Sequence, residues 1–278
     1  MGDTDTTGGA PVGSVHVADS NTVRAAVEIS EEAGRILSGY FRRGHVATRS
    51  KGDRDVVTEA DTASERYLLS ELRGRFPRDG VVAEEGGRVP STNGCCWYVD
   101  PLDGTMNFAR GIPIWCVSVG RLNHEQPDLG VIHDPTRGET FAAERGTGSR
   151  CNGRPMRCSE AEDIRDAFVH VTVDFETPSM AAGLDDLRSI APRALRTRNL
   201  GSAALALAYV AAGRFEAMLH RSANAWDYAA GVALTLESGG VVTDFHGKPY
   251  TSATTAVVAA CSERLHGQLL ACLGRAAG

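Results

Sequence analysis

The feature that most limits how this chain can fold is a set of acidic residues placed where apolar segments end or helices begin. A pair of glutamates follows the apolar run at 81–83, and an aspartate follows the run at 96–99. The members of the set are Asp61, Glu84, Glu85, Asp100, Asp103 and Asp227. Clustered carboxylates are costly to bury unless something neutralises them. Hard divalent cations such as Mg²⁺ bind oxygen ligands, so the pattern indicates a fold that gathers these side chains around cations.

The run DPLDGT, from Asp100 to Thr105, is the most specific part of this pattern. The proline after Asp100 fixes the turn that follows the strand. Asp100 and Asp103 can then face one group of ions, with the carbonyl of Leu102 as a further oxygen ligand. Gly104 allows the backbone to approach an anion, and the N–H groups of Gly104 and Thr105 can bind phosphate oxygens. The alternative is an ordinary Asp-Pro turn with the second aspartate as a local cap.

Each remaining acidic residue, taken alone, has a simpler interpretation. Glu84 and Glu85 can be a solvated pair on a loop, and Asp61 can serve only as the capping residue of a helix that begins after Thr58. Asp227 is an acid of the kind favoured near a helix N-terminus. Their joint occurrence in one chain is what favours a cation-binding centre.

Composition sets the class of protein and excludes several functions. The 278 residues, 42% of them hydrophobic, suffice for one large domain or two tightly packed halves. The net charge is -6 and no long basic run occurs, so a nucleic-acid partner has no electrostatic support. The seven cysteines show no CxxC spacing, which disfavours a disulfide framework or a structural zinc site. The start of the chain lacks the apolar core of a signal peptide, and no run approaches the roughly 18 apolar residues of a membrane span, so we expect a cytoplasmic protein.

Helix and strand patterns are mixed along the chain. Ser20 can cap a helix that runs to Phe41, after a flexible tail over residues 1–19, and Thr58 opens a second helix. Residues 151–166 have the character of a connector. Strands are expected at 81–83, 96–99, 117–122, 129–133, 140–143, 168–173, 215–219 and 241–243, and further helices at 202–212, 226–238 and 262–273. The order favours a layered α+β fold over strict alternation of strand and helix.

Four segments together resemble the inositol monophosphatase family, within the lithium-sensitive metal phosphatases that include the fructose bisphosphatases. These are 55–61 (DVVTEAD), 84–86 (EEG), 100–108 (DPLDGTMNF), and 226–231 (WDYAAG) with 237–240 (ESGG). The similarity runs over about residues 20–275. It implies a layered αβαβα sandwich in a single domain, with a metal-binding half to about residue 150 and a C-terminal half after it. It also implies a homodimer.

The resemblance also implies the ligands of two or three Mg²⁺ ions. Glu84, Asp100 and the carbonyl of Leu102 would bind the first ion. Asp100, Asp103 and Asp227 would bind the second, and a weaker third ion would lie near Glu84. Glu85 matches the other glutamate of its motif and is carried over as a further candidate ligand.

Catalytic and substrate-binding roles follow from the same resemblance. Asp61 and Thr105, with Glu84 at the ion, would orient and deprotonate the attacking water. The residues expected on the substrate side are Lys51, Gly104, Thr105, Gly201, Ser202, Ala203 and His220. Two metal ions can activate a water and stabilise both the entering and the leaving oxygen, so we expect in-line attack by water without a phosphoenzyme.

His220 marks the main departure from the family pattern. Many family members carry, seven residues before the last metal-binding aspartate, a glutamate that contacts a substrate hydroxyl. Here an acceptor has become a side chain that can donate, accept or titrate, so the contact to a polyol must differ. The functional interpretation is a substrate other than inositol phosphate, and the alternative is a surface residue on a variable edge.

The sequence therefore predicts a Mg²⁺-dependent phosphatase acting on a small phosphate monoester of an inositol, sugar, cyclitol or amino alcohol. Alternatives within the family are histidinol-phosphate or fructose-1,6-bisphosphate phosphatase, and a nucleotidase acting on adenosine bisphosphates. A non-enzymatic regulator on the same fold is disfavoured, because a degenerate site usually loses at least one acidic ligand and this chain retains the set.

Overall fold

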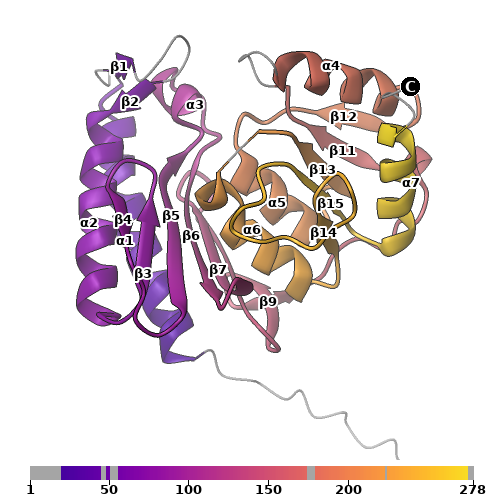
Figure 1. Ribbon diagram of the computed structural model, residues 1–278. Helices are drawn as coiled ribbons and strands as arrows, with labels where there is room; N and C mark the ends of the chain where they lie inside the picture. The colour runs from indigo at the N-terminus through magenta and orange to yellow at the C-terminus, as the bar shows by residue number, and fades with distance from the viewer. Residues whose placement is uncertain (1–19, 45–47, 51–55, 174–178, 223, 275–278) are drawn as a thin grey trace, which may run out of the picture.

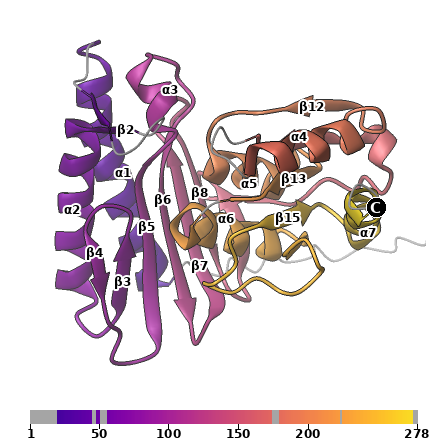
Figure 2. The ribbon, with the colours of Figure 1, turned by 45° about the horizontal axis from the view of Figure 1, so that its top comes forward.

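The chain forms five layers in the order helix, sheet, helix, sheet, helix (Figure 1). The computed structural model describes residues 20–44, 48–50, 56–173, 179–222 and 224–274. Figure 2 shows, from a second direction, that a pair of helices separates the two sheets. The αβαβα sandwich predicted from the sequence is therefore confirmed. The N-terminal segment 1–19 and Lys51 lie outside the described residues.

Two long helices form the first layer. Helix α1 (Asn21–Phe41) begins at Ser20, whose hydroxyl accepts a hydrogen bond from the N–H of Val23 at 3.3 Å. Helix α2 (Glu59–Arg75) begins with a capping box at Thr58, as the sequence predicts. A short two-stranded sheet of β1 (Thr48–Ser50) and β2 (Val56–Thr58) leads into α2.

The first sheet has eight strands. They are β3 (Gly80–Ala83), β4 (Gly87–Val89), β5 (Cys95–Asp103), β6 (Cys116–Asn123), β7 (Gln126–Asp134), β8 (Glu139–Glu144), β9 (Gly148–Cys151) and β10 (Arg154–Met156). Their order across the sheet is β10-β9-β8-β7-β6-β5-β3-β4, and only β3 and β5 are parallel neighbours. Ala83 pairs with Val99, so the residues that follow these two strands, Glu84 and Asp100, emerge side by side at one edge.

The middle layer consists of α5 (Ala203–Ala211) and α6 (Ala225–Glu237). Helix α6 lies directly on the first sheet over a pair of glycines, Gly120 in β6 and Gly130 in β7, which are cross-strand partners. A Cβ at Gly120 would lie 2.4 Å from the nitrogen of Ala230, and one at Gly130 would lie 2.2 Å from its oxygen. The absence of side chains at this pair therefore sets how closely α6 approaches the strands.

The second sheet and its outer helices complete the sandwich. The remaining elements are α3 (Thr105–Ala109), a 3₁₀ turn (Ile164–Asp166), β11 (Phe168–Val171), α4 (Ser179–Ile190), β12 (Arg196–Arg198), β13 (Ala217–His220), β14 (Val241–Thr243), β15 (Val257–Ala260) and α7 (Glu263–Gly274). The five strands run in the order β12-β11-β13-β15-β14, and α4 and α7 cover the outer face (Figures 1 and 2). None of the helices in the described residues is both long enough and apolar enough to cross a membrane.

Packed aromatic rings hold α3 beside the first sheet. The rings of Phe41, Phe108 and Trp115 lie with centroids 5.0–5.3 Å apart, and Phe108 and Trp115 are almost fully buried. Gly104 precedes α3 with φ of +93°, and a Cβ there would lie 2.8 Å from the carbonyl oxygen of Ile114. Glycine is the residue that tolerates both conditions. This packing fixes the start of α3, where Thr105 lies.

Some elements of the fold were not predicted from the sequence. The predicted connector 151–166 contains β10 and the 3₁₀ turn, and neither α4 nor β15 was predicted. Three-residue strands are too short to show a period, and the four consecutive buried apolar residues of β15 do not alternate. Periodicity alone does not distinguish such a run from part of a buried helix.

Candidate metal centre and substrate pocket

Strand β5 ends in an irregular turn that directs two carboxylates toward the middle layer. The pairing of β5 with β6 shifts register between Asp100 and Asp103. The N–H of Leu102 donates to Oδ1 of Asp100 at 2.9 Å. In a regular strand, residues three apart point to opposite faces, so the irregularity is what lets both carboxylates face α6. Asp100 is 3% exposed and Asp103 is 7% exposed.

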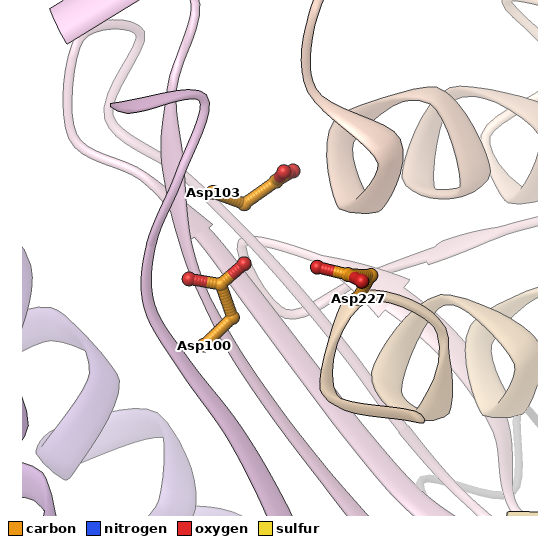
Figure 3. Close-up of side chains that lie close together, drawn as sticks. All are labelled: Asp100, Asp103 and Asp227. Carbon is orange, nitrogen blue, oxygen red and sulfur yellow. The ribbon is translucent and has the colours of Figure 1, made fainter. Parts of the chain in front are cut away.

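Asp227 completes the group from the first turn of α6. Its Oδ2 accepts a hydrogen bond from the N–H of Asn224 at 2.6 Å, which holds the side chain at the helix N-terminus. One carboxylate oxygen from each of Asp100, Asp103 and Asp227 lies within 4.8 Å of the other two. Figure 3 shows the three side chains directed toward one another, two from β5 and one from α6. The fold thus brings together three of the residues that the sequence predicts as ligands.

In the absence of cations, burial opposes the ionisation of all three carboxyls. Burial, followed by the negative charges of Glu84, Asp103 and Asp227, raises the pKa of Asp100 well above its usual range. Burial and the charge of Asp103 raise the pKa of Asp227 to about 8. A divalent cation would remove this penalty, because it neutralises the carboxylates that it binds. Buried oxygen donors with an excess of negative charge fit Mg²⁺.

Asp103 is also bound to the N-terminus of α5. Its Oδ2 accepts a hydrogen bond from the hydroxyl of Ser202 and another from the N–H of Ala204 at 2.8 Å. The N–H of Ala203 donates to the other oxygen at 3.3 Å, and the Sγ of Cys116 lies 3.7 Å from Oδ2. Ser202 and Ala203, predicted to face the substrate, therefore also hold a carboxylate of the candidate metal centre.

Asp61 and Thr105 are in contact, as their predicted shared role requires. The hydroxyl of Thr105 lies 3.3 Å from Oδ1 of Asp61 and 2.9 Å from the carbonyl oxygen of Leu102. Asp61 is fully buried, and its Oδ2 accepts hydrogen bonds from the N–H and the hydroxyl of Thr58. Burial raises the pKa of Asp61 against the opposing effect of these hydrogen bonds. This environment makes the carboxyl a better proton acceptor than an aspartate exposed to water.

Glu84 and Glu85 lie at the turn after β3. Glu84 is half-buried, and its charge contributes to the raised pKa of Asp61, Asp100 and Asp227, which places it at the rim of the centre. It is not part of the compact group of three aspartates. The side chain of Glu85 is exposed. The ligand roles of both glutamates stay predictions.

A pocket of about 340 Å³ opens beside the three aspartates, with Asp103 and Asp227 in its wall. Of the residues predicted on the substrate side, Gly201, Ser202, Ala203 and His220 line it. The uncharged polar side chains in its wall also include Thr172, Asn199, Ser222 and Asn224. These four residues were not predicted from the sequence, because a lone polar residue in a loop or at a strand end carries no distinctive pattern.

His220 lies at the end of β13 and is 8% exposed. Its ring packs edge-on against Tyr228, with centroids 5.7 Å apart. The interpretation of His220 as a surface residue on a variable edge is therefore wrong. Its neighbour Arg221 points elsewhere: the guanidinium forms two hydrogen bonds to Asp186, at 2.5 and 2.7 Å, and lies 4.1 Å from the ring centroid of Phe245.

The fold and the site together define a class of protein: a five-layered sandwich that carries three aspartates between its first sheet and its middle helices. The model of the inositol monophosphatase family matches residues 19–276. The chain belongs to the inositol monophosphatase family.

Relatives of known sequence and structure carry two kinds of name. The fructose-1,6-bisphosphatase/inositol-1-monophosphatase of Thermotoga maritima is 34% identical over 80% of this chain and 84% of its own. The Nus factor SuhB of Pseudomonas aeruginosa is 36% identical over the same shares. Among solved structures, the extragenic suppressor protein suhB of Bartonella henselae superposes with a TM-score of 0.87 at 32% identity, covering 91% of this chain and 98% of that one.

Proposed function

We propose that the protein is a Mg²⁺-dependent phosphatase that hydrolyses small phosphate monoesters. The observation that carries this proposal is the group of three aspartates, two buried and one half-buried, whose raised pKa values bound cations would offset. A phosphate dianion would not approach three carboxylates unless cations lay between them. Asp100, Asp103 and Asp227 would hold the ions together with Glu84 and the carbonyl of Leu102. When bound, the ions would act as Lewis acids on the phosphate and lower the pKa of a bound water.

The side chains around this centre can handle the proton and the phosphate. Oγ1 of Thr105 can accept a proton from the attacking water while Oδ1 of Asp61 accepts the hydroxyl proton of Thr105. The raised pKa of Asp61 suits this exchange. The amides at the start of α3 can bind phosphate oxygens. This route requires no nucleophilic side chain, so labelled substrate should leave no phosphate on the protein.

The pocket favours a monophosphate with a neutral, hydroxyl-rich leaving group. The described residues that line it include no lysine or arginine, and Arg221 is engaged with Asp186. Among these described residues a second phosphate would find no positively charged partner, and Lys51, predicted on the substrate side, lies outside them. Thr172, Asn199 and Ser222 offer hydrogen bonds to hydroxyl groups. We propose that His220 contacts the leaving group, where it can act as donor or as acceptor.

Phosphate release from a panel of monoesters, with and without Mg²⁺, tests the proposal. The panel holds inositol 1-phosphate, histidinol phosphate, aminosugar phosphates, fructose 1,6-bisphosphate and adenosine 3′,5′-bisphosphate, and Asp100→Asn is the control. We expect Mg²⁺-dependent release from a monophosphate, absent in the variant, with the two bisphosphates hydrolysed poorly. A bisphosphate as the best substrate would overturn the assignment of the pocket. If no compound released phosphate, the proposed phosphatase activity would be overturned.

A second candidate function is a regulatory role without catalysis, because several relatives are named Nus factor SuhB. The retained acidic group favours catalysis over this alternative. The test uses a strain that lacks the protein and has a measurable defect as a result. If the Asp100→Asn variant corrects that defect as completely as the wild type does, the regulatory function is favoured. Rescue by the wild type alone would favour the phosphatase.

A further inference from the structure

Helix α2 carries three buried polar side chains on one face. Asp61, Ser64 and Glu65 are spaced so that they follow one another along that face, and they are 0%, 0% and 6% exposed. Polar groups buried to this extent are costly unless they have partners. The partners are found in three separate segments of the site.

Asp61 contacts Thr105 at the start of α3, as described above. The hydroxyl of Ser64 donates to the carbonyl oxygen of Pro101 at 3.0 Å. Glu65 Oε2 accepts a hydrogen bond from the N–H of Glu85 at 2.8 Å. Each of the three side chains is therefore bound to a different part of the candidate centre.

The contact made by Ser64 supports the irregular end of β5. Pro101 lies inside the register shift between Asp100 and Asp103, where the ladder with β6 is interrupted. A carbonyl in such a position needs a donor from outside the sheet. Ser64 supplies that donor and ties the turn that bears both aspartates to a rigid helix.

The contact made by Glu65 supports the turn that carries Glu84. A Cβ on Gly86 would lie 2.8 Å from Oε1 of Glu65 and 2.6 Å from Leu69, so this turn rests directly on α2. On the other side, the N–H of Glu84 donates to the carbonyl of Val99 at 3.3 Å. The turn is thus held between α2 and β5.

We propose that Ser64 and Glu65 are positioning residues that set the affinity of the centre for divalent cations. They align two groups of ligands, Asp100 with Asp103 and Glu84 with its turn, without contributing to the chemical step. The inference rests on the cation-binding part of the proposed function. Groups that hold metal ligands in place in this way change metal affinity by about 10–100-fold.

The test compares Ser64→Ala and Glu65→Ala with two controls on the same helix: Ser70→Ala, at an exposed residue, and Glu71→Ala, at a half-buried glutamate that pairs with Arg75 away from the centre. Mg²⁺ binding is measured by calorimetry, and kcat at saturating Mg²⁺ is measured separately. We expect binding to weaken about 10-fold or more in the two test variants, with a much smaller change in kcat and none in the controls. Glu65→Gln should restore most of the affinity, because its amide oxygen can still accept the N–H of Glu85.

A second readout needs no cation and no substrate. Hydrogen exchange of the Glu85 amide in the cation-free protein should accelerate in Glu65→Ala and not in Glu71→Ala. Unchanged Mg²⁺ affinity or unchanged exchange in Glu65→Ala would overturn the role of Glu65, and unchanged affinity in Ser64→Ala would overturn that of Ser64. A wild-type protein that binds no divalent cation would instead overturn the proposed function, and this inference with it.

Discussion

The hydroxyl of Ser202 donates a hydrogen bond to the carboxylate of Asp103, so the start of α5 and the end of β5 meet at one side chain. Ser202 is also the N-cap of α5, where its oxygen accepts from the N–H of Leu205 at 3.3 Å. One hydroxyl therefore caps a helix of the middle layer and orients a candidate metal ligand of the first sheet.

Ser202→Ala should lower both stability and Mg²⁺ affinity. Loss of the cap should cost about 1 kcal/mol in the free energy of unfolding. Because Ser202 lowers the pKa of Asp103, its loss should raise that pKa and weaken Mg²⁺ binding at neutral pH. Urea unfolding and calorimetry measure the two effects. A variant with lower stability and unchanged Mg²⁺ affinity would contradict the second part.

Asp100→Asn should separate activity from stability. We expect kcat/KM to fall roughly a thousandfold, equivalent to about 4 kcal/mol of transition-state stabilisation. In EDTA at pH 8 the variant should be at least as stable as the wild type, because it removes a buried carboxyl whose ionisation is unfavourable. Saturating Mg²⁺, at about 100 times Kd, should stabilise the wild type by about 2.7 kcal/mol and the variant much less. Thermal unfolding with and without Mg²⁺ checks this, and equal stabilisation of both proteins would count against Asp100 as a ligand.

Cation-free protein should lose stability as pH rises from about 4, where aspartate titrates in the unfolded chain, to about 8, the pKa of Asp227 in the folded protein. The pKa of Asp227 is raised to about 8 and that of Asp100 is raised as well, whereas in the unfolded chain aspartate titrates near pH 4. The native state thus holds protons that the unfolded state has released, and stability falls as pH rises through the folded pKa. The urea midpoint in EDTA measures this loss of stability, with Asp227→Asn as the control that should show a shallower fall.

Arg221→Met should destabilise the protein through Asp186. The aspartate is 2% exposed, and burial raises its pKa while Arg221 opposes that rise. Removing the guanidinium leaves a buried carboxylate without its partner, at a cost of about 2–3 kcal/mol after allowance for the partly exposed arginine. Adding Asp186→Asn to Arg221→Met should recover part of the loss at neutral pH. Urea unfolding of the two single variants and the double variant gives the coupling, and additive effects would argue against it.

Gly120→Ala should separate α6 from the first sheet. The added Cβ would meet backbone atoms of Ala229 and Ala230, which cannot rotate away as a side chain could. We expect a loss of about 1–3 kcal/mol in stability and weaker Mg²⁺ binding, since Asp227 would shift relative to Asp100. Gly138→Ala, at an open turn with φ of +64°, serves as a control that is strained but far from this contact. Equal Mg²⁺ affinities in the two variants would contradict the expected shift.

Much of the centre could be predicted because its residues lie in short runs with a distinctive order. Asp100, Asp103 and Asp227 were expected together and lie together. The positioning roles of Ser64 and Glu65 could not be predicted, because their partners lie 37 and 20 residues away and no spacing rule links a helix face to a distant turn. The layers followed from the family resemblance, since the periodicity indicated only a mixed fold.

The close contact of α6 with Gly120 and Gly130 has a consequence for how the protein responds to heat. The contact joins backbone to backbone, so the distance between α6 and the first sheet is fixed. No side chain lies between them that could repack as the layers move apart. A slight loosening of the two layers would draw Asp227 away from Asp100 and Asp103 while both sheets stayed intact. Thermal inactivation should therefore precede thermal unfolding, and cations that bridge the two layers should raise the temperature of inactivation more than that of unfolding.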